Sequence, residues 1–261
     1  MATRVFLQQL YPDASKGDDA SSNFDVILVH GVNGDPVTTW EYKPTGDKRA
    51  DQDCKSKVWP RDLLPEVFPK ARVLSFGYNG DMYRNDSVAG IRDLGRSLLS
   101  YLTTKRQGID PDRPIIFVAH CLGGLIVKQF FFGTPHNGTN KDKWNHIANA
   151  YSPMDKSSMW GRRSRLVKSL KRNSQGLADL VDKFRHVAER YRIVSFYEMK
   201  KMKGANACIV DKAGARLEIA NEKLEGVDAD HVGMCRFERA EDMTFQVVCR
   251  HIREVVGESA S

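Results

Sequence analysis

The feature that most constrains this chain is an apolar run at residues 114–124 (PIIFVAHCLGG), which ends in a tight turn bounded by glycines. The pattern predicts a buried strand that leads through a sharp turn into a helix, with the reactive Cys121 at the apex. This layout is that of a nucleophile elbow, G-x-S-x-G. Two positions differ, because Ala119 replaces the first glycine and Cys121 replaces the serine. The chemistry open to the chain therefore depends on the Cys121 thiol.

Further apolar runs of strand length alternate with segments of helical spacing. Apolar residues recur every three or four positions in residues 88–105, which predicts a helix, and a C-terminal helix is predicted at residues 240–256. Strands are predicted at residues 4–10, 25–29, 72–76, 115–118, 130–132, 192–197 and 207–210. This alternation is typical of an α/β fold, in which a mostly parallel sheet has helices on both faces. In such folds ligands bind at the carboxyl ends of the strands.

The length of 261 residues is enough for one large domain with a core of its own. We predict an N-terminal strand and polar loop at residues 1–24, a single α/β domain at residues 25–256 and a tail at residues 257–261. Within that domain, residues 139–190 are polar and basic, and they are predicted to form a helical, lid-like insertion.

The chain has a formal net charge of +7, from 40 basic and 33 acidic residues, which suits an anionic partner. Much of the excess lies in residues 156–172, which contain arginines and lysines and no acidic residue. A solvated helix face is the simplest interpretation of this segment, and peripheral contact with an anionic membrane is the alternative. No nucleic-acid-binding motif accompanies it, so we expect no nucleic-acid partner.

Five cysteines occur without a C-x-x-C pair, which argues against a disulfide framework and against a zinc site. We therefore expect reduced thiols, no metal and no cofactor. The N-terminal residues are too polar for a signal peptide, and no apolar run is long enough to span a bilayer. These features predict an intracellular protein, either cytoplasmic or peripherally associated with a membrane.

Acyl transfer requires a nucleophile, a base, an acid that orients the base and hydrogen-bond donors for the oxyanion. Cys121 is the candidate nucleophile, since the N-terminus of the following helix would favour its thiolate. The candidate base is His231, which lies late in the chain as the order nucleophile, acid, base requires. Glu198 is the candidate acid because it directly follows a predicted strand. Asp211, which follows the strand predicted at residues 207–210, is the alternative acid.

The expected oxyanion donors are two backbone N–H groups, one from Leu122 after the nucleophile and one from Val32. His30 and Gly31 precede Val32 in a glycine-rich turn that lets the backbone approach a substrate closely. His120 is expected to pack beside the elbow rather than to transfer protons.

Several motifs follow one another along the chain. They are His30–Gly34 (HGVNG), Trp59–Leu64 (WPRDLL), Ala71–Tyr78 (ARVLSFGY), His120–Gly124 (HCLGG), Gly133–His136 (GTPH) and Asp228–His231 (DADH). Together, from about Asp25 to Arg253, they resemble the serine-active-site-containing (SERAC1-like) branch of the α/β-hydrolases, which is related to the DUF676-like lipases that include GPI-inositol deacylases. The resemblance implies an α/β-hydrolase fold and a hydrolase acting on ester bonds, with links to lipid remodelling at mitochondria and the endoplasmic reticulum.

Carried onto this sequence, the resemblance implies that Cys121 is the nucleophile, His231 the base and Glu198 the acid, with the oxyanion turn at His30–Val32. The predicted function is accordingly hydrolysis of a carboxylic ester, with a lipid-like substrate, through a Cys-His-Glu triad and without a cofactor. Two alternatives stay open. One is acyl transfer through a thioester, and the other is a catalytically degenerate signalling or lipid-binding module.

The segment between the elbow and Phe130–Phe132 is shorter than the resemblance implies. A parallel crossover typically needs about a dozen residues or more, and this segment provides fewer. Two outcomes follow. Either Phe130–Phe132 is not a regular strand, or the segment after the elbow is extended rather than helical.

Overall fold

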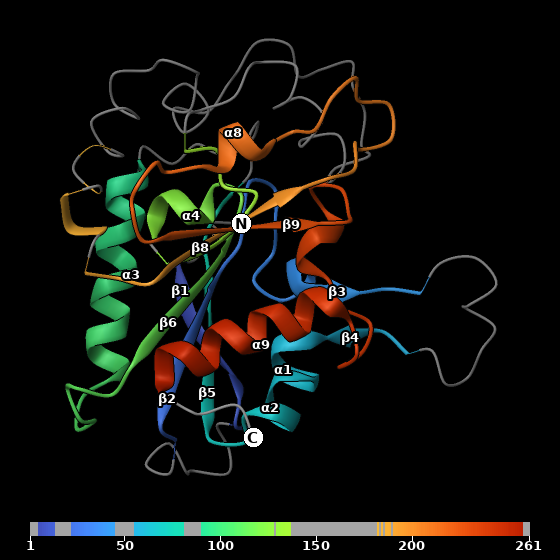
Figure 1. Cartoon of the computed structure of the whole chain (residues 1–261). Helices are drawn as coiled ribbons and strands as arrows, with labels where there is room; N and C mark the ends of the chain where they lie inside the picture. The colour runs from blue at the N-terminus through green and yellow to red at the C-terminus, as the bar shows by residue number, and fades with distance from the viewer. Residues whose placement is uncertain are drawn as a thin grey trace.

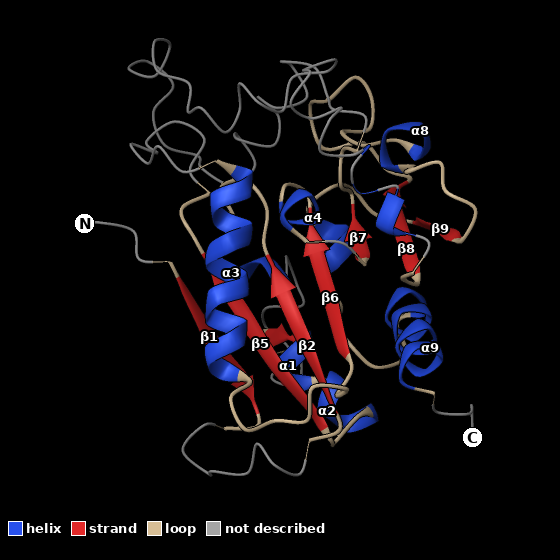
Figure 2. Cartoon of the chain, turned by 90° about the vertical axis from the view of Figure 1, so that its left-hand side faces the viewer, coloured by secondary structure: helices blue, strands red, loops and turns tan. Residues whose placement is uncertain are grey.

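The computed structural model describes residues 5–13, 22–44, 55–80, 90–127, 129–136, 182, 184, 186–188 and 190–257. These residues (Figure 1) contain a sheet of seven strands, whose order β1-β5-β2-β6-β7-β8-β9 can be followed in Figure 2. The strands are β1 (Phe6–Tyr11), β2 (Phe24–Val29), β5 (Ala71–Gly77), β6 (Ile115–His120), β7 (Phe130–Phe132), β8 (Ile193–Glu198) and β9 (Glu222–Val227). β1 is antiparallel to β5, and each other neighbouring pair is parallel. The predicted mostly parallel sheet is confirmed.

Helices cover both faces of this sheet, and Figure 2 shows α3 in front of it with α1 and α2 behind. The apolar residues of β2 alternate between two cores, since Ile27 and Val29 belong to one and Val26 and Leu28 to the other. The first core includes residues of α3 (Ile91–Lys105) and α4 (Gly123–Ile126), and the second includes residues of α1 (Trp59–Asp62), α2 (Leu64–Val67) and α9 (Met243–Val256). A strand buried on both faces explains the continuous apolar runs.

Smaller elements connect these layers. β3 (Glu41–Tyr42) and β4 (Lys57–Val58) form a short antiparallel pair. A single helical turn, α8 (Lys212–Ala215), lies between β8 and β9, and 3₁₀ turns lie at Thr38–Trp40 and Gly233–Cys235. The second of these turns follows the loop that contains His231, and therefore borders the predicted site.

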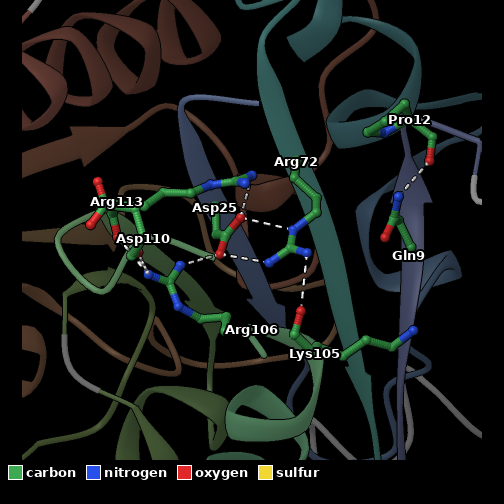
Figure 3. Close-up of polar contacts among 8 residues, drawn as sticks. All are labelled: Gln9, Pro12, Asp25, Arg72, Lys105, Arg106, Asp110 and Arg113. Atoms are coloured by element: carbon green, nitrogen blue, oxygen red, sulfur yellow. Dashed lines mark hydrogen bonds and ion pairs between the residues drawn. The ribbon is translucent and has the colours of Figure 1, made fainter. Parts of the chain in front are cut away.

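A buried ion cluster ties several elements together at the amino-terminal ends of the parallel strands (Figure 3). Asp25 of β2 accepts two hydrogen bonds from the guanidinium of Arg72 of β5, both of 2.9 Å. Arg106, just after α3, binds the same carboxylate, and a guanidinium nitrogen of Arg113, before β6, lies 2.7 Å from it. The side chains of Asp25 and Arg72 are fully buried. One carboxylate thus joins cations from three separate parts of the chain.

The far edge of the sheet differs from the prediction. The prediction of a strand at residues 207–210 is wrong. These residues form a loop, from which Ile209 and Val210 pack into the core. The last strand is instead β9, which the sequence did not indicate. The residues of β9 (EKLEGV) are largely polar, as suits a strand that pairs with β8 along one side. The helix predicted at residues 240–256 is confirmed from Met243 onward.

The short segment after the elbow begins with one helical turn. α4 ends at Ile126, Val127 is extended, and β7 begins at Phe130. β7 pairs in parallel with both β6 and β8, so the strand predicted at residues 130–132 is confirmed. The crossover suffices because Phe130 pairs with Val118, near the carboxyl end of β6. After the elbow, the chain therefore runs back beside only the last few residues of β6 before β7 begins.

The predicted lid-like insertion at residues 139–190 lies outside the described residues, apart from isolated positions between 182 and 190, and so does its basic part at residues 156–172. Among the residues that are described, none of the helices combines the length and the apolar character that crossing a bilayer requires.

Candidate active site

The turn between β6 and α4 has the backbone geometry of a nucleophile elbow. Cys121 has a φ of 53°, in the left-handed region that costs a non-glycine residue about 1–3 kcal/mol. Its N–H donates a 2.9 Å hydrogen bond to the carbonyl of Phe132 in β7. A Cβ at Gly123 would lie 2.3 Å from the carbonyl oxygen of Val29, so only glycine lets α4 pack this closely on β2. The strained position falls on the predicted nucleophile.

The predicted base and acid lie in contact. His231 is in the loop after β9, and Glu198 is the last residue of β8. Nδ1 of His231 lies 3.3 Å from Oε1 of Glu198, and both side chains are fully buried. The same Glu198 oxygen accepts a hydrogen bond from the N–H of Val210. The loop that includes Val210 therefore fixes the carboxylate that orients the imidazole.

Burial and the neighbouring charges act on the pKa of His231 in opposite directions. Burial alone would lower the pKa of His231, because an apolar environment disfavours the charged ring. The neighbouring Cys121 thiolate and, to a lesser degree, the Glu198 carboxylate overcome this and raise the pKa to about 10. Since α4 is a single turn, a long helix dipole does not point at Cys121.

A second buried histidine holds the base loop against the elbow. Nε2 of His120 lies 2.8 Å from the backbone carbonyl of His231, and the two rings are 4.9 Å apart. Burial, together with the positive charge of His231, lowers the pKa of His120 well below its ordinary value. The ring is therefore neutral, and its Nε2–H donates to the carbonyl. His120 packs beside the elbow as predicted.

The turn after β2 brings the second predicted oxyanion donor to the nucleophile. A Cβ at Gly31 would lie 2.6 Å from the Cβ of Cys121, so the glycine backbone packs directly on the elbow. Val32 and Leu122 are both fully buried. In the part of the chain that the structure describes, no hydrogen bond uses the N–H of either residue. Two buried donors next to a nucleophile are what an oxyanion site requires.

The alternative acid, Asp211, has a different role in the structure. It is the N-cap of α8, and its carboxylate accepts a 2.8 Å hydrogen bond from the N–H of Gly214. Its prediction depended on the strand at residues 207–210, which does not form. Glu198 occupies the position that faces His231. Within the described ranges, no group of three or more His, Cys, Asp or Glu side chains is arranged to hold a metal ion.

Tyr78 belongs to this site and was missed from the sequence. It follows β5, and its hydroxyl donates a 2.7 Å hydrogen bond to the backbone carbonyl of His30. Burial raises the pKa of Tyr78 well above its ordinary value, and the charge of Cys121 adds to the effect. The available signal was its position at the carboxyl end of a predicted strand, the edge at which ligands bind.

No family model matches the sequence. The chain is similar to Protein SERAC1 from Danio rerio, with 25% identity over 266 residues, and to Protein SERAC1 from Homo sapiens, with 22% identity over 267 residues. Both matches cover 89% of this chain and 39% of the relative, so the chain spans about two fifths of the length of these curated relatives.

Two solved structures share the fold. The mature Bacillus licheniformis lipase BlEst2 matches with a TM-score of 0.58 and 17% identity, over 95% of this chain and 98% of the lipase. A carboxylesterase structure from the thaumarchaeon Nitrososphaera gargenis matches with a TM-score of 0.55 and 11% identity, over 98% of this chain and 96% of the other. The chain is similar in sequence to SERAC1, and it has the α/β-hydrolase fold. The comparisons confirm the resemblance to SERAC1 that the motifs indicated, and they confirm the predicted fold class. The catalytic residues stay predictions.

Proposed function

We propose that this chain hydrolyses carboxylic esters with Cys121 as nucleophile, His231 as base and Glu198 as acid. The main support is a cysteine held at a strained position together with a buried His231 whose pKa is raised to about 10, against the effect of burial, by the charges of Cys121 and Glu198. A thiolate is the reactive form of cysteine, and a cationic neighbour stabilises it. The Val32 and Leu122 N–H groups provide the donors that a tetrahedral intermediate needs.

In the first half of the reaction, the Cys121 sulfur attacks the ester carbonyl carbon, and the carbonyl electron pair moves onto the oxygen. The N–H groups of Val32 and Leu122 stabilise this oxyanion. When the intermediate collapses, the bond to the leaving alkoxide breaks, and His231 donates its proton to the alkoxide as it departs. A thioester on Cys121 remains.

In the second half, neutral His231 takes a proton from water as the water oxygen attacks the thioester carbonyl. The new oxyanion occupies the same donors, and its collapse releases the carboxylic acid and returns the Cys121 thiolate. Glu198 keeps Nδ1 of His231 oriented in both halves, because it accepts the hydrogen bond from that nitrogen.

The proposed substrate is lipid-like. Cys121, Val32 and Leu122 are buried members of one hydrophobic core, which suits an acyl chain better than a charged group. The likeness to SERAC1 and to a lipase and a carboxylesterase supports the same class of substrate. Peripheral contact with an anionic membrane through residues 156–172, and association with mitochondria or the endoplasmic reticulum, stay predictions.

The test compares wild type with Cys121→Ala, Cys121→Ser and the control Cys208→Ser, which changes a half-buried cysteine that takes no part in the proposed reaction. Turnover of p-nitrophenyl esters and alkylation by iodoacetamide are measured for each protein. We expect turnover in wild type and in Cys208→Ser, and its loss in Cys121→Ala.

An inactive wild type whose Cys121 is alkylated slowly would contradict the proposal. Turnover confined to Cys121→Ser would instead identify a serine-hydrolase scaffold that the native cysteine inactivates. Release of a new ester or amide in the presence of an added alcohol or amine would favour the acyl-transfer alternative over hydrolysis.

A further inference from the structure

The orientation of the Gly31–Val32 peptide decides whether an oxyanion donor exists. In a trans peptide the C=O and the N–H point in opposite directions, so the carbonyl of Gly31 fixes the direction of the Val32 N–H. That carbonyl lies 2.9 Å from Nδ1 of His30 and accepts a second hydrogen bond, of 3.2 Å, from the N–H of Gly34. These two contacts hold the oxygen on one side of the turn and leave the Val32 N–H on the other.

The hydrogen bonds of His30 define the tautomer that makes this contact. The backbone N–H of Tyr78 lies 3.3 Å from Nε2 of His30, so Nε2 is the acceptor and cannot bear the proton. Burial lowers the pKa of His30 to about 4, and the ring is therefore neutral near pH 7. A neutral imidazole without a proton on Nε2 has it on Nδ1. Nδ1–H thus donates to the Gly31 carbonyl.

Tyr78 holds the histidine from two more directions. Its ring stacks on the His30 ring, with centroids 4.2 Å apart and planes inclined by 8°. Its hydroxyl donates a 2.7 Å hydrogen bond to the backbone carbonyl of His30. The His30 ring is fully buried, and Tyr78 is nearly so. The pair has no other function in the proposed mechanism, yet it borders the nucleophile.

We propose that His30, clamped by Tyr78, is a positioning residue that orients the Gly31–Val32 peptide so that the Val32 N–H faces the developing oxyanion. This inference rests on the proposed function, because an oxyanion forms only if Cys121 attacks a carbonyl group. The two residues of the turn thus have different roles. Gly31 lets the backbone pack closely on Cys121, and the side chain of His30 orients the following peptide group.

The test separates carbonyl attack from reactivity of the thiol. Acylation by p-nitrophenyl butyrate passes through an oxyanion, whereas alkylation by iodoacetamide is a displacement at a saturated carbon and forms none. His30→Leu removes the donor to the Gly31 carbonyl, and we expect the acylation rate of Cys121 to fall roughly 10²–10³-fold, the loss typical of one oxyanion donor. The alkylation rate should stay close to that of wild type.

Two matched variants complete the series. His30→Asn places an amide donor near the position of Nδ1 and should recover most of the acylation rate. Tyr78→Phe keeps the stacked ring and removes the hydroxyl, and it should give a smaller loss than His30→Leu. Thermal unfolding identifies any variant that fails to fold, in which case Tyr78→Phe and His30→Asn still decide the question.

The inference is overturned if acylation and alkylation fall by the same factor, or if acylation is unchanged in His30→Leu. A crystal structure of His30→Leu gives an answer that does not depend on turnover. Retention of the Gly31–Val32 peptide orientation would overturn the inference, and a flipped peptide would support it. A wild type that alkylates but does not acylate would refute the proposed function instead.

Discussion

Replacement of Asp25 by asparagine should destabilise the fold strongly although it changes almost no volume. Three guanidinium groups converge on this carboxylate, and the Arg72 side chain has no exposed surface. Arg106 and Arg113 have 12% and 6% of their side chains exposed, so they can turn toward water. Arg72 extends from β5, inside the sheet, and its fully buried side chain cannot. The variant therefore leaves one buried cation without a countercharge.

The expected cost follows from that uncompensated charge. Removal of one partner of a buried ion pair typically lowers the free energy of unfolding by about 3–5 kcal/mol. Total stabilities are about 5–15 kcal/mol, so this is a large share. For a chain of this size each kcal/mol lowers Tm by about 2–4 °C, which gives a decrease of roughly 6–20 °C. Calorimetry and urea unfolding of Asp25→Asn measure it.

A matched control and a double variant test the explanation. The control Asp228→Asn breaks an ion pair with Lys200 that is 2.7 Å long, as is the pair of Asp25 with Arg113. The side chains of Asp228 and Lys200 are 78% and 57% exposed, so this variant should cost at most about 1 kcal/mol of unfolding free energy. Asp25→Asn combined with Arg72→Met removes the stranded cation and should recover part of the loss. The reasoning is refuted if Asp25→Asn costs no more than the control, or if the double variant is less stable than Asp25→Asn.

Three further expectations concern the site and the helices. Cys121→Ala removes the charge that raises the pKa of His231 to about 10, so the imidazole should lose its proton at lower pH in an NMR titration. In wild type the stabilisation from protonated His231 is present below pH 6.5 and is lost as the pH rises through about 10. Between these two pH values, the free energy of unfolding should therefore fall less in Cys121→Ala than in wild type. Equal decreases in the two proteins would contradict the role of the Cys121 charge. Gly123→Ala should abolish ester turnover and lower Tm, because the added Cβ would meet the Val29 carbonyl. The control is Gly95→Ala in α3, where the nearest atom to an added Cβ is 3.7 Å away, and it should stabilise the chain by about 0.5–1 kcal/mol in urea unfolding. Similar effects at both positions would rule out the packing argument. Asp242→Ala should cost about 1 kcal/mol in the same assay, because the carboxylate caps α9 through the N–H groups of Thr244 and Phe245, and an unchanged midpoint would count against the cap.

The centre of the sheet was predictable because burial on both faces leaves a plain signal. β2, β5 and β6 lie between two cores, and most of their residues are apolar. β9 has one strand neighbour and a largely polar sequence, so no run of apolar residues indicates it. The apolar residues at 207–210 misled the prediction for a related reason, since a loop can also be buried. Apolar character reports burial, and burial is not confined to strands.

In the candidate site, too, some residues were indicated by the sequence and others were not. Cys121, His231 and Glu198 were predictable because each follows a strand or has a motif position in a known order. The clamp between His30 and Tyr78 was not, since the two residues are far apart in sequence and meet only when β2 and β5 pair. The direction of a peptide group likewise leaves no pattern in the sequence.

The brevity of the segment between β6 and β7 has a consequence for how the site comes together during folding. Cys121, the N–H of Leu122 and the carbonyl of Phe132 that accepts from the Cys121 N–H lie within a dozen neighbouring residues, so little chain entropy opposes their contact. Glu198 and His231 come from much later in the chain. The strained thiol can therefore exist before its base arrives. Under the proposed function, Cys121 therefore becomes fully reactive only when β8 and β9 have joined the sheet and brought Glu198 and His231 into place.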